Sequence, residues 1–328
     1  MGERRIARAL VLVLALACAA LVVACGDDEG GGGGGDTAEV TTLKVGVIPI
    51  ADVAPLYLGV EQGFFEEENL EIEPQLAEGG AAIVPSVLSG DYQFGFSNVT
   101  SLIIAASKDL PVQIIAQGVL GGTSAEDAWD GVVVPKGSKI KTPKDFEGAT
   151  VAVNTLNNIG PLAMNSSMEK AGADYTKIKY VEVPFPDMNA ALEAGRVDAA
   201  WEVEPAFSGG KAAGGRAIMN PYEETAPNLT VATYFASKQY IAENEEIVDG
   251  FKRAIEKSLD YASQNPEEVR KVIGTYTEIP QEVLDKITLP QWKADLNEPT
   301  IELNAELAKK YGFIEEIPSL DDLIRRGS

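Results

Sequence analysis

The sequence predicts an α/β protein with two lobes of similar topology, and an internal duplication is the main evidence. Residues 45–56 (VGVIPIADVAPL) align without gaps on residues 151–162 (VAVNTLNNIGPL), at an offset of 106. Residues 90–96 align on residues 195–201 at nearly the same offset, 105. Two matches at nearly one spacing indicate two related units, because two copies of this size are too few and too large for a solenoid.

The second observation is that strand and helix patterns alternate. Each copy predicts an apolar strand, at 44–48 and at 150–154, followed by a loop and a helix that ends at a glycine, Gly63 or Gly172. Such alternation favours parallel sheets, in which ligands bind at the carboxyl ends of the strands. Towards the C-terminus, helical patterns predict a back layer of helices over residues 243–264, 266–276, 280–287 and 301–311.

The chain must pass between the lobes at least twice if its C-terminal region returns to the first lobe. The candidate crossings are residues 118–134 and residues 228–237, and the second contains a predicted strand over 230–235. We therefore expect one lobe to comprise residues 41–128 and 229–328, and the other to comprise residues 129–228.

The N-terminus reads as an export signal. Three arginines precede sixteen consecutive apolar residues, 9–24, and Cys25 follows. This pattern resembles a bacterial lipobox, which implies removal of a signal peptide (1–24) and diacylation of the Cys25 thiol. An uncleaved transmembrane anchor is the alternative. Residues 25–40 contain six consecutive glycines and predict a flexible, lipid-anchored linker.

Composition excludes several classes of function. The chain has 27 basic and 50 acidic residues, a net charge of −23, which disfavours nucleic-acid binding. It has no histidine, and its two cysteines are Cys18 and Cys25. Ser-His, Cys-His and His-zinc chemistry and a disulfide framework are therefore excluded. We expect no cofactor and no resident metal.

Three segments resemble a known family. They are residues 54–65 (APLYLGVEQGFF), residues 194–201 (AGRVDAAW) with Glu204-Pro205, and residues 310–314 (KYGFI) with 320–324 (LDDLI). They are similar to the nitrate, sulfonate and taurine type of ABC-transporter substrate-binding protein, and the similarity covers nearly all of residues 41–326. The resemblance implies a two-lobe, type II periplasmic-binding-protein-like fold, with parallel-rich sheets flanked by helices and a ligand cleft between the lobes.

The same resemblance implies a function. It predicts a non-enzymatic monomer that binds a small polar organic solute, sulfonate- or taurine-like or pyrimidine-like, and delivers it to an ABC permease and its ATPase. The family also includes enzymes of thiamine-pyrimidine synthesis, and such an enzyme is the alternative. That branch carries a His- and Cys-rich iron motif, which this chain lacks. Nitrate binders use a histidine and a lysine, so nitrate and bicarbonate are disfavoured here.

The candidate ligand-binding residues follow predicted strands or lie near a crossing. They are Asp52, Val53, Ser97, Asn98, Thr100, Trp129, Asn157, Asn158, Trp201 and Glu202, with Asn154 beside the second-lobe asparagines. Asp52 and Asn158 are predicted N-caps of the helices that follow. The free N–H groups of residues 53, 54, 159 and 160 could hold an anion, or the cap side chains and water could satisfy them.

Glu202 bears on the charge of the solute. Strand alternation places Glu202 and Glu204 on one face, and Glu204 precedes Pro205, which favours a capping role for Glu204. Glu202 is then the better candidate for a ligand contact. Because no lysine or arginine occurs in residues 201–210, we hypothesise a solute with a cationic or hydrogen-bond-donating group.

Overall fold

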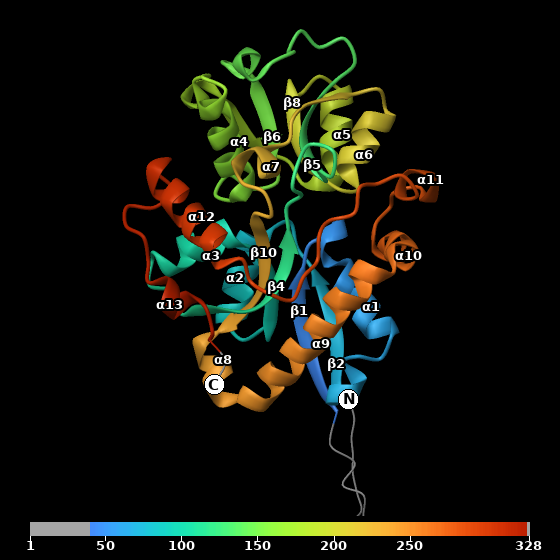
Figure 1. The fold of residues 1–328 in the computed structure, drawn as a ribbon, viewed down its shortest axis with the longest axis vertical. Coiled ribbons are helices and arrows are strands. Elements are labelled where there is room, and N and C mark those ends of the chain that lie inside the picture. The colour runs from blue at the N-terminus through green and yellow to red at the C-terminus, as the bar shows by residue number, and fades with distance from the viewer. Residues whose placement is uncertain (1–39, 327–328) are drawn as a thin grey trace, which may run out of the picture. The chain divides into compact units, whose positions relative to one another are not determined.

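The computed structural model describes residues 40–326, which contain two five-stranded sheets (Figure 1). The strand order is β2-β1-β3-β10-β4 in the first sheet and β7-β6-β8-β5-β9 in the second. The strands are β1 (Thr41–Val47), β2 (Leu70–Leu76), β3 (Phe94–Asn98), β4 (Val112–Leu120), β5 (Asp130–Val134), β6 (Thr150–Val153), β7 (Lys179–Glu182), β8 (Ala199–Val203), β9 (Arg216–Met219) and β10 (Thr230–Ser237). The two orders match, with β6 in the place of β1 and β8 in the place of β3, so the predicted duplication of topology is confirmed.

One strand of each sheet is antiparallel to its neighbours, whereas alternation alone predicted parallel sheets. β5 is antiparallel to β8 and β9, and β10 is antiparallel to β3 and β4. These are the strands by which the chain enters one sheet from the other. In the register, Asp130 begins β5 opposite Val203, the last residue of β8. A strand that enters at the edge where its neighbours end must run in the opposite direction.

Helices cover both sheets. They are α1 (Ala54–Glu61), α2 (Gly80–Leu88), α3 (Val99–Ala106), α4 (Ile159–Lys170), α5 (Phe185–Glu193), α6 (Ala206–Ala212), α7 (Pro221–Thr225), α8 (Lys238–Glu243), α9 (Glu245–Gln264), α10 (Pro266–Tyr276), α11 (Gln281–Leu284), α12 (Glu298–Lys310) and α13 (Leu320–Leu323). The long helix α9 packs on α1 and β4, and α10 packs on α1, as the expected back layer does (Figure 1). The helix expected over 280–287 is shorter, because α11 ends at Leu284.

The ends of the duplicated helices follow local chemistry. Gly63 and Gly172 follow α1 and α4 with φ of +75° and +70°, the left-handed conformation that favours glycine. Asn158 is the N-cap of α4, as predicted. Asp52 is not the cap of α1, because a short 3₁₀ turn, η1 (Ala51–Val53), comes first and moves the start of the helix to Ala54. Within residues 40–326, no helix has the length and apolar character needed to cross a membrane.

Candidate functional site

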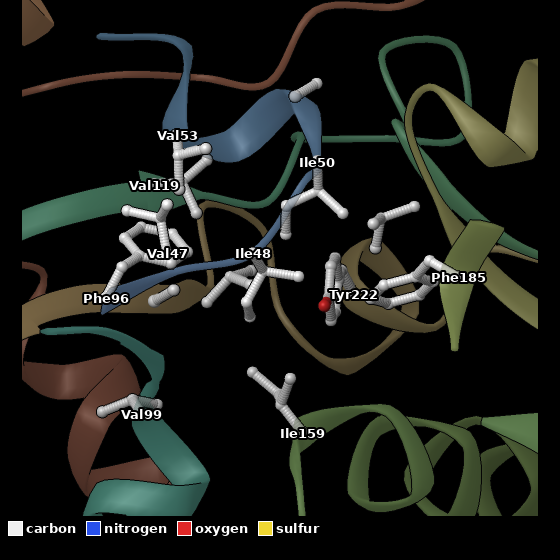
Figure 2. Close-up of a cluster of buried hydrophobic side chains, with 14 of the residues drawn as sticks. Val47, Ile48, Ile50, Val53, Phe96, Val99, Val119, Ile159, Phe185 and Tyr222 are labelled. Atoms are coloured by element: carbon white, nitrogen blue, oxygen red, sulfur yellow. The ribbon is translucent and has the colours of Figure 1, made fainter. Parts of the chain in front are cut away.

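A small cavity lies where the edges of the two sheets meet. Side chains from both sheets line it: Ile48, Ile50, Asp52, Phe96, Asn98, Asn154, Asn158, Ile159, Phe185, Trp201, Val203, Tyr222, Val231 and Ala232. Figure 2 shows Ile48 and Ile50, from the segment between β1 and η1, with Ile159, Phe185 and Tyr222 from three helices. The space is about 20 Å³, enough for about one water molecule. The sheets must therefore separate before an organic solute can enter.

Asp52 is the unpartnered acid of this cavity. Its side chain is almost fully buried, and Oδ1 has no hydrogen-bond partner among the described residues. Burial raises the pKa of Asp52 to about 8. At neutral pH the Asp52 side chain is therefore a carboxylic acid, which can ionise beside a cation or a strong hydrogen-bond donor. A hydrogen bond also holds the η1 turn that carries Asp52, because Trp292 donates its Nε1–H to the Asp52 backbone carbonyl at 3.1 Å.

Asparagine side chains occupy the helix N-termini that face the cavity. Asn98 caps α3 and accepts hydrogen bonds from Ser101 N–H at 2.9 Å and from Ile159 N–H at 3.3 Å. Asn158 accepts from Gly160 N–H at 2.8 Å and donates to Asn154 Oδ1 at 2.6 Å. The N–H groups of residues 159 and 160 are thus already bonded, so these donors are not free for an anion in this conformation.

Aromatic rings form the opposite wall. The Trp201 ring lies 5.7 Å from Tyr222 and 5.6 Å from Phe185, centroid to centroid, in edge-on and tilted arrangements. Trp201 also packs on the first turn of α4, where a Cβ on Gly160 would lie 2.5 Å from its ring. Glycine is therefore needed at position 160 for this close approach.

The cavity offers no positive side chain. Neither lysine nor arginine is among its lining residues. Across residues 40–326, no group of three or more His, Cys, Asp and Glu side chains is arranged to hold a metal ion. The arrangement can accept hydrogen bonds at Asp52 and enclose a flat apolar or aromatic group beside Trp201.

Comparison with known proteins identifies the family. Residues 50–269 match the family described as NMT1/THI5 like. This chain belongs to the NMT1/THI5-like family.

Curated relatives of this NMT1/THI5-like protein include binding proteins and enzymes. The formylaminopyrimidine-binding protein of Halalkalibacterium halodurans is 26% identical over 67% of this chain and 65% of its own length. The taurine-binding periplasmic protein of Escherichia coli is 26% identical over 62% of this chain and 61% of its own length. Both alignments span slightly under two thirds of the relative. A 4-amino-5-hydroxymethyl-2-methylpyrimidine phosphate synthase of Candida albicans is 24% identical over 68% of this chain and 67% of its own length.

Solved structures confirm the fold. The alkanesulfonate-binding protein SsuA of Xanthomonas axonopodis pv. citri, bound to MOPS, superposes with a TM-score of 0.74 at 16% identity, covering 88% of this chain and 100% of that chain. The two parallel-rich sheets flanked by helices are thus the periplasmic-binding-protein fold that the sequence resemblance implied.

Four of the ten predicted site residues of this NMT1/THI5-like protein line the cavity: Asp52, Asn98, Asn158 and Trp201. Three candidates next to strands of the first sheet lie outside it. Val53 is buried at the start of α1. Ser97 donates to the Asn98 carbonyl at 3.1 Å on the face of β3 that packs against Gly80, and Thr100 donates to Asn304 Oδ1 at 3.2 Å.

Two candidates near or beyond the first crossing also lie outside the cavity. Trp129 is fully buried, donates its Nε1–H to the Leu120 carbonyl at 3.0 Å and packs 5.1 Å from Tyr222. Trp129 therefore packs against the aromatic wall of the cavity through Tyr222 and does not line the cavity itself. Asn157 is exposed, and its backbone carbonyl, not its side chain, accepts a hydrogen bond from Ser101 Oγ at 3.1 Å.

Glu202 lies on the opposite face of β8 from the cavity. Trp201 and Val203 line the cavity, whereas a Cβ on Gly210 of α6 would lie 2.8 Å from Glu202 Oε2. Both Glu202 oxygens are buried without a partner among the described residues, and burial followed by the charge of Glu204 raises the pKa of Glu202. The expectation of a ligand contact at Glu202 is therefore corrected, because alternation turns this side chain away when its neighbours face the cavity.

Sequence reasoning missed three aromatic side chains of the cavity: Phe96, Phe185 and Tyr222. Phe96 could have been predicted from the sequence, because the 105-residue offset pairs it with Trp201. Phe185 begins α5 just after β7, at a strand's carboxyl end, where ligands bind in such sheets. Tyr222 belongs to α7, a five-residue helix with no marked periodicity.

Proposed function

We propose that this protein is an extracytoplasmic solute-binding lipoprotein of an ABC importer. In this proposal a signal peptide (1–24) is removed, Cys25 is lipidated, and residues 25–40 tether a monomer to the membrane; these residues, other than Val40, lie outside the described part of the chain. The two sheets belong to lobes formed by residues 41–128 with 229–328 and by residues 129–228. The lobes close on a small polar solute, which is delivered to the permease and its ATPase. No nucleic acid is involved.

The observation that carries the proposal is the buried Asp52 carboxyl, whose Oδ1 has no partner among residues 40–326, in a cavity between the two sheets that aromatic rings also line. A buried carboxyl group without a partner is costly unless something supplies a hydrogen bond or a positive charge. A bound solute would satisfy it. The binding proteins among the relatives support the same class of function.

The lining residues favour a pyrimidine-like solute over a plain sulfonate. A flat ring bearing an amino group would place N–H donors at Asp52 and its face against the Trp201 and Tyr222 wall. A sulfonate or nitrate would meet a carboxyl group and no lysine or arginine. An aminosulfonate such as taurine offers an ammonium to Asp52 but nothing for the aromatic wall to enclose. We therefore place an aminopyrimidine first and an aminosulfonate second.

Titration calorimetry tests this ranking. Formylaminopyrimidine, taurine and methanesulfonate would be titrated into the wild type, Asp52→Asn and Glu202→Gln. Glu202→Gln is the matched control, since it also removes a buried, unpartnered acid but on the other face of β8. We expect roughly 10- to 100-fold weaker aminopyrimidine binding in Asp52→Asn, as for loss of a hydrogen bond to a charged group, and unchanged binding in Glu202→Gln. Methanesulfonate bound more tightly than either amine would contradict the proposed ligand class.

The same mixtures separate binding from catalysis. Formylaminopyrimidine incubated with the protein and recovered unchanged, as judged by mass spectrometry, agrees with a binding protein. Conversion to a new compound would favour the enzymatic alternative.

A further inference from the structure

Two side chains from the C-terminal part of the chain hold the η1 turn that carries Asp52. Tyr276 of α10 donates its phenol O–H to the carbonyl of Ile50, the residue before the turn, at 3.0 Å. Trp292 donates its indole N–H to the Asp52 carbonyl at 3.1 Å. The backbone is therefore bonded on both sides of Ala51, which restricts the direction in which the Asp52 side chain leaves it. We call Tyr276 and Trp292 the η1 clamp.

Tyr276 is fixed by a second aromatic ring. Its ring stacks on Tyr57 of α1, with 4.1 Å between the ring centroids and 13° between the ring planes. Helix α1 continues directly from η1 and packs on α9, which packs on β2 and β4 of the first sheet. Tyr276 therefore stays with the first sheet.

Trp292 is fixed by the connection between α11 and α12, residues 285–297, which crosses the junction of the two sheets (Figure 1). Its side chain is buried, with 5% exposed. The carbonyl of the neighbouring Gln291 accepts the backbone N–H of Leu120 at 2.9 Å. Leu120 ends β4, just before the first passage of chain between the sheets (121–129). The backbone beside Trp292 is thus hydrogen-bonded to the first sheet.

The far end of the same connection is bonded beside the second passage between the sheets (226–229). Asn297 donates its side-chain N–H to the Asn228 carbonyl at 2.8 Å. The Asn297 carbonyl accepts the hydroxyl of Thr230, the first residue of β10, at 3.2 Å. Trp292 therefore lies between two points at which the connection is bonded to strands of the first sheet or to the chain next to them.

A third bond to the turn differs from the η1 clamp, because it joins the two sheets. Ala51 donates its backbone N–H to the Glu204 carbonyl at 2.9 Å, and Glu204 directly follows β8 of the second sheet. Separation of the sheets would break this bond. The bonds of the η1 clamp, whose members are held on the first sheet, would remain.

We propose that Tyr276 and Trp292 are positioning residues for Asp52: they fix the direction of its carboxyl group into the cavity, independently of the contact between the sheets. A solute that enters after the sheets separate would then meet an acid already in its binding geometry, so less conformational entropy would be lost on binding. The role of Asp52 in binding rests on the proposed function, whereas the placement of its side chain by the η1 clamp does not.

The surroundings of Asp52 make its titration a measure of how the turn is held. No lysine or arginine is among the residues that line the cavity. The other titratable groups near Asp52 are the phenols of Tyr222, Tyr234 and Tyr276. Burial raises the pKa of Asp52 to about 8. A turn that loses its clamp would let water reach the carboxyl group, and the pKa of Asp52 would fall towards its ordinary value.

Three variants test the placement of the side chain. Tyr276→Phe removes one hydroxyl group and keeps the ring that stacks on α1, and Trp292→Phe removes the indole N–H. Tyr180→Phe is the matched control, since the Tyr180 phenol also donates one hydrogen bond, to Asn165 Oδ1 at 2.9 Å, but joins β7 to α4. It should lower stability about as much as Tyr276→Phe without touching the η1 turn.

The first measurement needs no ligand. The pKa of Asp52 would be determined in the full-length protein by ¹³C NMR of side-chain carboxyl groups between pH 5 and pH 10, with the Asp52 resonance assigned by its absence in Asp52→Asn. We expect this pKa to fall by about one unit in Tyr276→Phe and in Trp292→Phe, because the carboxyl group gains water. It should be unchanged in Tyr180→Phe. A merely structural role of the clamp would lower stability and leave this pKa constant.

The second measurement asks whether the clamp acts through Asp52. Formylaminopyrimidine would be titrated into Tyr276→Phe and into the double variant Tyr276→Phe/Asp52→Asn, each compared with its parent protein. We expect roughly 3- to 10-fold weaker binding when Asp52 is present, as for a loss of preorganisation, and less than about twofold when it is replaced. Tyr180→Phe should bind as the wild type does.

Either measurement can overturn the proposal. A pKa of Asp52 that is equal in the wild type and both clamp variants would do so, as would the same loss of affinity from Tyr276→Phe in the two backgrounds. If Trp292→Phe does not fold, Tyr276→Phe alone decides both measurements. If formylaminopyrimidine binds none of these proteins, the proposed ligand is wrong, while the pKa of Asp52 still decides whether the clamp positions its side chain.

Discussion

Asn98 joins two helices that belong to different sheets. Its Oδ1 accepts from Ser101 N–H, within its own helix α3, and from Ile159 N–H, the first residue of α4. One side chain therefore caps a helix and contacts the opposite side of the cavity. An N-cap without this second bond would stabilise only its own helix.

Replacing Asn98 separates these two roles. We expect Asn98→Ala to lower the free energy of unfolding by about 1 to 2 kcal/mol, the usual effect of losing a cap, and to shift the protein towards a more open form. Denaturant unfolding measures the first effect and small-angle X-ray scattering the second. Ser237→Ala is the matched control, because Ser237 caps α8 through Tyr240 N–H alone. It should lose similar stability without opening. Equal scattering curves for the two variants would contradict a bridging role for Asn98.

Stability should fall as the pH rises through neutrality. The pKa of Asp52 is about 8 in the folded protein and 3.8 as its ordinary value, so between these values the folded state binds more protons than the unfolded state. The free energy of unfolding then falls with increasing pH, by up to about 1.4 kcal/mol per pH unit for one such group. Asp130, Glu202, Glu204 and Glu223 also have raised pKa values and act in the same direction.

Melting temperatures from pH 5 to pH 8 check this dependence. The wild type should lose stability steadily over this range, and Asp52→Asn should lose less, because the amide cannot ionise. A wild type that becomes more stable between pH 5 and pH 8 would show that these buried acids are not protonated in the folded state.

Gly160 should be intolerant of a side chain. The Cβ of Gly160→Ala would lie 2.5 Å from the Trp201 ring, so the ring must move. We expect a loss of about 1 to 3 kcal/mol of stability, as for overpacking, with a changed tryptophan emission spectrum. Gly209→Ala is the control, since the added Cβ there would meet one atom, Asn189 Nδ2, at 3.2 Å. A Gly160→Ala protein as stable as the Gly209→Ala protein would mean that Trp201 is not held against α4.

Lipidation should depend on one cysteine. Cys25→Ser should leave the precursor without a diacyl group, whereas Cys18→Ser should leave lipidation unchanged. Mass spectrometry of the membrane-extracted protein distinguishes the two forms. A diacyl group on Cys18 would move the anchor to that residue.

The similar topology of the two sheets could be predicted from the sequence, because the internal duplication is visible as two aligned pairs of segments. The offset pairs Phe96 with Trp201, and both line the cavity; it also pairs Ser97 with Glu202, and both point away from it. The strands β1, β6 and β10, the helices α1, α4, α9, α10, α11 and α12, and the Asn158 cap followed from local patterns, because apolar periodicity and end residues are local properties.

The orientation of Glu202 could not be predicted by alternation alone. All five residues of β8 are buried, so neither face is marked by exposed polar side chains. Tyr222 was missed for a different reason. It reaches the cavity because the chain turns back through α7 before the second passage, which is a tertiary arrangement and leaves no local pattern.

The size of the cavity has a kinetic consequence. Because the cavity in this conformation has room for about one water molecule, an organic solute can enter it only in molecules whose sheets have already separated. The observed association rate should then rise with solute concentration and level off at the rate of opening. At high solute concentration, the rate of solute capture would then be limited by the opening of the protein and no longer by diffusional encounter with the solute.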